Sequence, residues 1–444
     1  MLFSNKKLTA TPVQRSRELQ FCRESKVVAG SNSNTNVDLL SLSAGAAGYF
    51  GLKISIYNEP RGSGIGGAEF VAALLSEALA KDDHKVDLFH RIPSLTAEKL
   101  GANTGTDLKN VQLHYIELPD IESQLSRRNP LSHYKQSRKF LAEFSEGYDI
   151  FVAIMHGVPP FSHAKKGALI CLFPTPTAPY VKPEGGVDVA LARKRPLKYL
   201  YQSWAWKKRM ATYQLKTAIS DFSRSWAQKR WGIDCEIVYP PVNTAFDRVK
   251  KDKIILSVGR FVIKGEGHTK KQEEMLDVYR RMNGERPHDW KYFCVGGLGI
   301  TPEHKVYFEK LSALAAPSGA QLVANIDRGE LKSLYERASI FWHAAGYEED
   351  QNTRPIYLEH FGISTVEAMA AGCVPVVINK GGQPEIVEHG VNGFLWETLD
   401  ELRDYTTRLI NDDDLRVKMS EAARKRAQVF STESFIANFV RRLR

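Results

Sequence analysis

"YLEHFGISTVEAMAAGCVPVVINKGGQPEIVEHGVNGFLW", residues 357–396, contains two glutamates, Glu359 and Glu367, with seven residues between them. The letters "TVEAMAAG" predict a helix that follows "FGIS", and the apolar run "VPVVI" is typical of a short buried strand. Backbone N–H groups at a helix start attract anions, because they lack intrahelical acceptors and lie at the positive end of the helix dipole. This stretch therefore predicts a helix, then a strand, with positive potential at Gly362–Ser364.

Short strand-like runs separated by helical stretches continue on both sides of this segment. They are KISIY (53–57), KVDLF (85–89), VQLHYIEL (111–118), YDIFVAIM (148–155), GALICLF (167–173) and CEIVY (235–239), then KIILSVG (253–259), YFCVGG (292–297), AQLVAN (320–325) and ASIFWHA (338–344). Such alternation is typical of a parallel, doubly wound sheet covered by helices. The prolines and charges of "YPPVNTAFDRVKKDK" interrupt the pattern, as a linker does. We therefore expect an α/β protein with two Rossmann-like domains in tandem.

The same pattern sets the expected domain bounds. They are an N-terminal extension at 1–51, a first domain at 52–240, a linker at 241–252, a second domain at 253–430 and a terminal helix at 431–444. Ser431 or Thr432 is the expected cap of that last helix. Residues 1 to about 50 show no sustained period, so we expect a mobile extension; its basic, Ser/Thr-containing start also fits a transit peptide.

Composition limits the partners and the compartment. The chain has 444 residues, of which 43% are hydrophobic and 25% charged, with a formal net charge of +10 that favours anionic partners. Its five cysteines are far apart and form no C-x-x-C pair, so we expect reduced thiols rather than a disulfide or zinc framework: Cys22, Cys171, Cys235, Cys294 and Cys373. No apolar run approaches the roughly 20 residues that span a bilayer, which predicts a cytoplasmic protein.

A glycine-rich stretch, "RGSGIGGAEF" at 61–70, raises the hypothesis of a nicotinamide dehydrogenase. Gly62, Gly64 and Gly67 match G-x-G-x-x-G, and Asp87 lies twenty residues further on. In a dinucleotide fold the first glycine follows the strand at once and the acidic residue ends the second strand, whereas here four residues intervene and the strand continues past Asp87. We therefore expect Gly66 and Gly67 to receive a phosphate-bearing ligand other than NAD.

The spacing of Glu359 and Glu367 resembles the E-x7-E signature of retaining GT-B glycosyltransferases of family 4. Three further segments are similar to that family: "SVGRFVIKGEGHTKKQEEML" (257–276), "GGQPEIVEHGVNGFL" (381–395) and "SDFSRSWAQKRWGIDCEIVYPPVN" (220–243). The resemblance covers residues 52–444. It implies the GT-B fold, in which two Rossmann-like domains face a cleft, the first for the acceptor and the second for the nucleotide-sugar donor, and it allows the C-terminal helix to return to the first domain.

The resemblance also implies roles for particular residues. Arg260 and Lys270 would stabilise the charge that develops on the departing diphosphate, with Lys271 and Lys264 as alternatives for the lysine. Glu359 would hold hydroxyls of the donor sugar and Glu367 the ribose. The remaining donor-binding residues are Gly66, Gly67, Phe361, Gly362, Ile363 and Ser364. Arg260, Lys270 and the N–H groups of Gly362–Ser364 would take over the role of a metal ion. No D-x-D motif stands at a strand end, so we expect no metal and no other cofactor.

Each of these residues also has a simpler interpretation. Ser364 and Glu367 form S-x-x-E, which is a helix capping box, and Arg260 on its own is a surface charge. Two carboxylates also suit a glycoside hydrolase, although a hydrolase does not need the neighbouring phosphate-binding groups. His156 ends a predicted strand and is the candidate to face the donor sugar, because Leu172 and Phe173 stand where many relatives have a histidine. A histidine at a strand end is equally well a structural residue.

Residues 189–220 include no acidic side chain and mix basic with aromatic ones. This composition fits an anionic membrane surface, and the alternatives are a solvated helix and a nucleic-acid contact, for which no binding module is apparent. The residues expected at a membrane surface are Arg193, Lys194, Arg195, Lys198, Trp204, Trp206, Lys207 and Lys208.

We therefore expect a retaining glycosyltransferase that moves a sugar from a nucleoside-diphosphate sugar to a glycan, a lipid-linked acceptor or a small molecule. The family mechanism is attack on the face from which the diphosphate leaves, without an enzymic nucleophile. The alternative is a non-catalytic sugar-nucleotide or membrane-binding protein of the same fold, and an NAD-dependent dehydrogenase is a weaker third hypothesis. The contacts that choose base, sugar and acceptor come from variable loops, so the expectation ends at the class of reaction.

Overall fold

The computed structural model describes residues 51–59, 65–117, 130–176, 181–182, 184–263, 269–284 and 287–443. Five of the expectations above fall outside these ranges: nearly all of the extension 1–51, Cys22, Gly62, Gly64 and Lys264.

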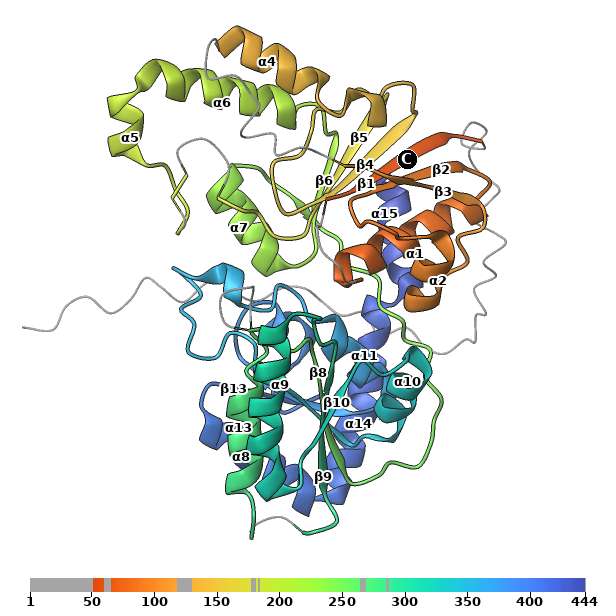
Figure 1. Ribbon diagram of the computed structural model, residues 1–444, viewed down its shortest axis with the longest axis vertical. Coiled ribbons are helices and arrows are strands. Elements are labelled where there is room, and N and C mark those ends of the chain that lie inside the picture. The colour runs from red at the N-terminus through yellow and green to blue at the C-terminus, as the bar shows by residue number, and fades with distance from the viewer. Residues whose placement is uncertain are drawn as a thin grey trace, which may run out of the picture. The chain divides into compact units, whose positions relative to one another are not determined.

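The first part of the chain forms a parallel sheet in the order β3-β2-β1-β4-β5-β6-β7 (Figure 1). Its strands are β1 (Lys53–Asn58), β2 (Lys85–His90), β3 (Val111–Tyr115), β4 (Ile150–Met155), β5 (Lys166–Cys171), β6 (Leu215–Ala218) and β7 (Glu236–Ile237). The helices are α1 (Gly67–Lys81), α2 (Ala97–Thr104), α4 (Pro130–Lys139), η2 (Ala142–Phe144), α5 (Val189–Lys194), α6 (Pro196–Met210) and α7 (Asp221–Trp231). The carboxyl ends of all these strands lie at one edge, which is where such sheets bind ligands.

The second part repeats the architecture with the order β10-β9-β8-β11-β12-β13, also parallel. Its strands are β8 (Ile254–Val258), β9 (Lys291–Gly296), β10 (Gln321–Ala324), β11 (Ile340–His343), β12 (Val374–Ile378) and β13 (Phe394–Trp396). Its helices are α8 (Gln272–Arg281), α9 (Pro302–Ala315), η3 (Ala316–Ser318), α10 (Arg328–Arg337), η4 (Pro355–Tyr357), α11 (Ile363–Ala371), α12 (Gln383–Ile386), α13 (Leu399–Asn411), α14 (Asp413–Ala427), η5 (Gln428–Phe430) and α15 (Thr432–Leu443).

The prediction of two doubly wound, Rossmann-like domains is confirmed. The sequence analysis missed β6 and β13, because "LKTA" carries a lysine and a threonine and "FLW" is only three residues long. The residue bounds predicted for the domains and the linker stay predictions; the two sheets lie within 53–237 and 254–396. The four cysteines in the described ranges are buried and unpaired, as expected: Cys171, Cys235, Cys294 and Cys373.

The last helix returns to the first sheet. Phe435, Phe439 and Leu443 of α15 are buried in the same apolar cluster as residues of β1 and α1. Lys166 Nζ at the start of β5 donates a hydrogen bond to the Leu443 carbonyl, and Arg442 pairs with Glu236 at 2.6 Å. Ser431 Oγ accepts from the Ser434 N–H at 3.2 Å, so Ser431 is the cap of the helix. The chain therefore crosses from the second domain back to the first before it ends.

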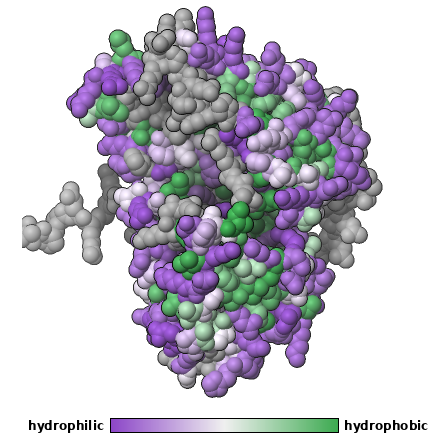
Figure 2. Space-filling view, viewed as in Figure 1, coloured by the Kyte–Doolittle hydropathy of each residue, from purple (hydrophilic) through white to green (hydrophobic). Residues whose placement is uncertain are grey.

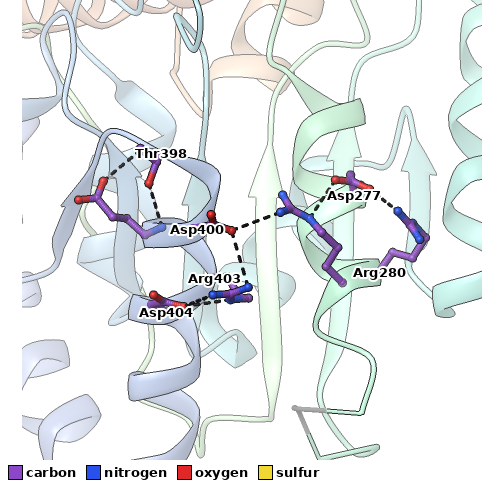
Figure 3. A network of polar contacts seen from close by, with 8 residues as sticks. Asp277, Arg280, Thr398, Asp400, Arg403 and Asp404 are labelled. Atoms are coloured by element: carbon purple, nitrogen blue, oxygen red, sulfur yellow. Dashed lines mark hydrogen bonds and ion pairs between the residues drawn. The ribbon is translucent and has the colours of Figure 1, made fainter.

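Surface ion pairs connect α8 to α13 on the second domain (Figure 3). Arg281 of α8 contacts Asp277 on its own helix at 3.0 Å and Asp400 of α13 at 3.3 Å, and Arg403 continues the network. Thr398 caps α13, with Glu401 completing a capping box. Exposed pairs of this kind contribute well under about 1 kcal/mol each, so the buried faces of the two helices hold them together more than the charges do.

Asp87 has a structural role that accounts for it without a dinucleotide. Its carboxylate, buried in β2, accepts hydrogen bonds from Tyr148 Oη at 3.0 Å and His114 Nε2 at 2.7 Å. Burial and this carboxylate both raise the pKa of Tyr148. The acidic residue of the G-x-G-x-x-G hypothesis therefore joins β2 to β3 and to the turn before β4.

We predict that Asp87→Ala lowers the free energy of unfolding by about 2 kcal/mol, because the buried Tyr148 hydroxyl and the half-buried His114 imidazole lose a charged acceptor. Denaturant titration measures this, and Asp234→Ala, at an exposed position, should change it little. Turnover of a sugar donor per folded molecule should stay unchanged. Saturable NADH binding that disappears in Asp87→Ala would instead support a dinucleotide fold.

Candidate functional site

The loop that carries Glu359 is held by two glycines from the following strand–helix connection. The Gly382 N–H donates to the Glu359 carbonyl at 2.9 Å. A Cβ atom at Gly381 would lie 2.2 Å from that same carbonyl oxygen, and one at Gly382 would lie 2.6 Å from the His360 carbonyl oxygen. Gly381 also has a φ of +63°. Only glycine permits this approach, so the "GG" of residues 381–382 fixes the backbone that presents Glu359.

Helix α11 begins at the end of this loop. Its N-cap is Gly362, with a φ of +126°, and no side chain caps it. The capping-box interpretation of Ser364 and Glu367 is therefore wrong, because the helix starts before Ser364 and Glu367 lies more than a turn inside it. No side chain therefore caps the first N–H groups of α11, at Ile363 and Ser364, and their binding of a donor stays a prediction.

Glu367 is buried and bonded by two side chains of α10. Arg328 Nη2 donates to its Oε1 at 3.0 Å, and Tyr335 Oη donates to its Oε2 at 3.1 Å. Burial raises the pKa of Glu367, against the opposing effect of Arg328. A carboxylate held in this way has a fixed orientation and can still accept further hydrogen bonds, as a ribose ligand must.

Glu359 lies with Lys270 and His343. Lys270 Nζ is 2.6 Å from Glu359 Oε2, and His343 Nε2 is 3.1 Å from the same oxygen. Burial is the main reason that the pKa of His343 is lowered, so the imidazole is neutral near pH 7. Lys271 points elsewhere, with Nζ 3.7 Å from both Glu274 and Glu349. Of the two described lysine candidates, the structure thus groups Lys270 with Glu359.

Arg260 follows β8 in the same region. Its side chain is exposed, and its carbonyl accepts from Gln272 Nε2 at 3.0 Å. The neighbouring Gly259 packs against Lys270, because a Cβ atom at Gly259 would lie 2.7 Å from Lys270 Cγ. The Lys270 side chain therefore packs beside Gly259, the residue before Arg260, at the end of β8. The two cations predicted for a diphosphate start from neighbouring positions.

The glycine loop of the first domain meets the start of α11. Gly66 is the N-cap of α1, and its N–H donates to Glu69 Oε2 at 2.8 Å. A Cβ atom at Gly67 would lie 3.2 Å from Ile363 Cδ1. The φ of Gly66 is −125° and Gly67 is not among the glycines with positive φ, so the backbone here is not left-handed, and a Cβ atom would meet only the ends of the Glu69 and Ile363 side chains.

His156 lies beyond the end of β4, close to the loop of Glu359. Its Nδ1 is 3.3 Å from the Phe173 carbonyl, and its ring is 6.3 Å from that of His360. Phe173 stacks on His360 with ring centroids 3.9 Å apart. Burial lowers the pKa of His156. The imidazole is thus neutral and close to the residue that follows Glu359.

Sequence reasoning missed the contacts that join the two domains at this point. Ser220 Oγ donates to the His360 carbonyl at 2.6 Å, and the N–H groups of Asp221 and Phe222 donate to the Glu385 carboxylate at 2.7 and 2.9 Å. Glu385 thereby caps α7 from the other domain. It also missed His343 and Arg328, since each lies far in sequence from the glutamate it contacts and no local pattern marks it.

The predicted membrane-surface residues lie on α5 and α6, apart from the residues above. Figure 2 shows mostly hydrophilic side chains over these helices with hydrophobic ones among them. Leu197, Leu200 and Trp204 are 82%, 61% and 45% exposed. Trp206 differs from the prediction, because its Nε1 donates to the Trp231 carbonyl at 2.9 Å and its ring packs on Trp231. Trp204 thus lies on the exposed surface of α6, whereas Trp206 packs against Trp231.

Two properties of the described residues concern metal ions and membranes. Within those ranges no group of three or more His, Cys, Asp or Glu side chains is arranged to hold a metal ion. In the same part of the chain, every helix is too short or too polar to cross a bilayer.

Comparison with protein families identifies the chain. The model described as "Glycosyltransferase Family 4" matches residues 65–246, and the model described as "Glycosyl transferases group 1" matches residues 244–426. The chain belongs to glycosyltransferase family 4. The two matches meet between the two sheets, so each family model covers one Rossmann-like half of this family 4 chain.

Curated relatives are similar over about half of the chain. A GDP-Man:Man(3)GlcNAc(2)-PP-Dol alpha-1,2-mannosyltransferase of Dictyostelium discoideum is 29% identical over 232 residues, which are 48% of this chain and 43% of that protein. The human alpha-1,3/1,6-mannosyltransferase ALG2 is 25% identical over 232 residues, which are 47% of this chain and 52% of ALG2. The chain spans about half the length of the curated relatives it matches.

Solved structures share the fold. A glycosyltransferase of Rickettsia africae superposes with a TM-score of 0.59 at 17% identity, over 88% of this chain and 98% of that one. Anabaena Alr3699/HepE, solved with UDP and glucose, gives 0.56 at 17% identity, over 88% of this chain and 99% of that one. These likenesses support the GT-B architecture of the family 4 chain.

We predict that Gly382→Ala lowers the free energy of unfolding by about 2 to 3 kcal/mol, because its Cβ would meet backbone atoms that cannot move aside. The φ of Gly382 is −84°, so the backbone itself accepts alanine and the cost is steric. Gly297→Ala is the matched control, since its Cβ would make only an ordinary contact, 3.7 Å from Arg260 Cγ. Equal unfolding midpoints for the two variants would contradict the close approach.

Proposed function

We propose that this chain is a retaining glycosyltransferase that moves a sugar from a nucleoside-diphosphate sugar to a glycan or lipid-linked acceptor. The proposal rests on one observation: Lys270, Glu359 and the uncapped start of α11 come together at the carboxyl ends of the second sheet. Family membership supplies the class of reaction, and these residues supply the groups that it needs.

Departure of the donor places negative charge on a nucleoside diphosphate. Arg260, Lys270 and the N–H groups of Ile363 and Ser364 are the positive groups that would stabilise it, and preorganised donors of this kind lower the barrier because they need no rearrangement. In our proposal they do so without a metal ion. Lys270 would exchange its contact with Glu359 for a diphosphate oxygen, which frees the carboxylate to bind hydroxyls of the sugar.

Retention of configuration would follow from attack on the same face of the sugar from which the diphosphate leaves. A phosphate oxygen then takes the proton of the acceptor hydroxyl as the new glycosidic bond forms. His343 contacts Glu359, and the His156 ring lies near that of His360. In our proposal Glu359 and His156 contact the sugar without forming a covalent bond to it. Glu367, fixed by Arg328 and Tyr335, would hold the ribose.

The names of the relatives suggest which substrates to test first. The matched mannosyltransferases of Dictyostelium discoideum and human are named for GDP-mannose and a dolichol-diphosphate-linked glycan. We therefore place GDP-mannose and lipid-linked oligosaccharides first in a panel that also includes UDP- and ADP-sugars. Nucleoside diphosphate release that depends on an acceptor separates an enzyme from a non-catalytic sugar-nucleotide-binding protein.

Arg260→Ala and Lys270→Ala should each reduce kcat/KM for the best sugar donor roughly 30- to 900-fold. This corresponds to a loss of about 2 to 4 kcal/mol of transition-state stabilisation, the usual effect of removing one hydrogen-bond donor to a developing charge. Release of nucleoside diphosphate is the measurement.

Lys271→Ala is the matched control for Lys270, because its ammonium faces Glu274 and Glu349 instead of Glu359. It should stay within a few-fold of the native chain. A change of less than threefold in both Arg260→Ala and Lys270→Ala would overturn the diphosphate assignment.

We also propose that α5 and α6 rest on an anionic membrane. Leu197, Leu200 and Trp204 recur at i, i+3 and i+7 and thus share one side of α6, while lysines and arginines flank them. An apolar stripe with basic neighbours binds a lipid interface by burying the stripe and attracting acidic headgroups. This position would bring a lipid-linked acceptor to the first domain.

Replacing Leu197 and Leu200 together with serine should reduce binding to phosphatidylserine-containing vesicles at least fivefold, since two buried apolar side chains contribute more than about 2 kcal/mol. Co-sedimentation measures it. Val306→Ser is the control, because Val306 is 65% exposed on α9 of the second domain. Equal binding of the native chain to pure phosphatidylcholine, or no vesicle binding at all, would overturn this part of the proposal.

A further inference from the structure

His343 is the last residue of β11, and Glu359 lies in the loop that follows this strand. The strand is central in its sheet, paired with β8 on one side and with β12 on the other, so the sheet holds the backbone of His343. Glu359 belongs to neither a strand nor a helix. A side chain that starts from a strand keeps its position more precisely than one on a loop, so His343 is suited to fix the position of Glu359.

One oxygen of Glu359 meets two partners. His343 Nε2 is 3.1 Å from Glu359 Oε2, and Lys270 Nζ is 2.6 Å from the same oxygen. The side chain of His343 is 3% exposed and that of Glu359 is 17% exposed, so water competes weakly for their contact. Hydrogen bonds to an ionised group are stronger than those between neutral groups. The carboxylate is therefore held by a rigid imidazole and by a long, flexible lysine.

The contact also decides the tautomer of His343. Burial is the main cause of the lowered pKa of His343, so the ring is neutral near pH 7 and carries a single N–H. An ionised carboxylate only accepts hydrogen bonds, which places that N–H on Nε2. Nδ1 then carries a lone pair, and it is buried without a hydrogen-bond partner. Among the residues that the structure describes, Glu359 is the one hydrogen-bond partner of this imidazole.

The residues between His343 and Glu359 form a loop whose two ends meet. Lys380 Nζ donates to the Glu349 carbonyl at 2.8 Å, and a Cβ atom at Gly346 would lie 3.0 Å from Leu358 Cγ. Compact surface loops with their ends in contact are frequently functional. The hydrogen bond from His343 to Glu359 closes this loop at its base, so it ties the glutamate to the end of β11.

Lys270 is a partner that Glu359 loses when a donor binds, if the proposed function is correct. The ammonium would then turn to a diphosphate oxygen, because that group carries more negative charge than one carboxylate. A neutral imidazole is not attracted in this way, and it starts from a strand. The bond from His343 would therefore remain and keep the carboxylate in place while the sugar binds.

We infer that His343 is a positioning residue, which holds the Glu359 carboxylate in its sugar-binding orientation while Lys270 turns to the diphosphate. The inference rests on the proposed function, in which Glu359 binds hydroxyls of the donor sugar. His343 acts through Glu359 and contacts neither the sugar nor the diphosphate. Its contribution is therefore limited to binding of the sugar part of the donor.

The test compares nucleoside diphosphates with their sugar derivatives, by calorimetry on the full chain. The probes are GDP with GDP-mannose, UDP with UDP-glucose and ADP with ADP-glucose, and the pair that binds the native chain most tightly is used for all variants. His343→Leu removes the hydrogen-bond donor, and His343→Gln keeps an N–H group at the end of the side chain. Phe341→Leu is the matched control, because Phe341 is a core residue two positions earlier on the same strand.

We expect His343→Leu to bind the sugar nucleotide at least about fivefold more weakly than the native chain, the usual effect of losing a hydrogen bond to a charged group. Its affinity for the nucleoside diphosphate should stay the same. His343→Gln should restore most of the lost affinity. Phe341→Leu should lower the melting temperature and leave the ratio of the two affinities unchanged. His343→Asn, whose amide is too short to reach Glu359, replaces His343→Leu in the comparison if the leucine variant does not fold.

A second measurement asks whether His343 acts through Glu359. In a chain that already carries Glu359→Ala, His343→Leu should cause no further loss of sugar-nucleotide binding, because the group that it positions is gone. Additive losses would mean that His343 contacts the sugar itself and would overturn the inference.

Two other results of the calorimetry would also overturn it. They are equal weakening of the nucleoside diphosphate and of its sugar derivative in His343→Leu, which is the effect of a purely structural residue, and unchanged binding of both. The proposed function survives these results, because the native chain still binds a donor. Failure of the native chain to bind any of the three nucleoside diphosphates is a different outcome, since it would overturn the proposed function and the inference with it.

Discussion

The close packing of Gly381 and Gly382 against residues 359–361 is the constraint on which the rest of the site depends. It places the Glu359 carbonyl against the Gly382 N–H and leaves the Glu359 side chain directed at Lys270 and His343. From the same loop the chain enters α11 through Gly362, whose φ of +126° is open to few other residues. Glu359, the uncapped start of α11 and Glu367 thus have their relative positions set by one run of backbone.

The opposite end of α11 explains why its start can be left uncapped. Lys251 Nζ donates to the Ala371 carbonyl at 2.7 Å, Arg424 Nη1 donates to the Ala370 carbonyl at 2.9 Å, and Ser420 Oγ to that of Gly372 at 2.6 Å. Two cations at a helix C-terminus interact favourably with the helix dipole. Burial lowers the pKa of Lys251, which shows that its ammonium is held at some cost in hydration. The fold therefore stabilises the C-terminal end of α11, while no side chain caps its N-terminal end.

The sequence was sufficient where function depends on short patterns and insufficient where it depends on distant contacts. Glu359 and Lys270 are 89 residues apart, and only the family resemblance suggested that they act on one ligand, yet the structure places them 2.6 Å apart. The S-x-x-E pattern, by contrast, suggested that Ser364 caps α11, whereas the N-cap of that helix is Gly362. Arg328 and His343 belong to no motif that local spacing reveals, and Glu385 lies in the segment GGQPEIVEHGVNGFL, which did not indicate its contact with α7. Their roles come from the packing of α10, β11 and α12 against residues far along the chain.

The domains are joined next to the catalytic loop rather than away from it. Glu385 caps α7 across the boundary, Ser220 bonds the carbonyl of His360, and Phe173 stacks on the His360 ring. These contacts fall on His360, which follows Glu359, and on Glu385, which is three residues after Gly382. Burial raises the pKa of Glu385, and the N–H groups of Asp221 and Phe222 oppose that shift by bonding its carboxylate. Separation of the domains would expose that carboxylate and remove the partners of His360 together. The loop of Glu359, which in our proposal holds the donor sugar, therefore packs against residues of the first domain, so its conformation depends on contacts from both domains.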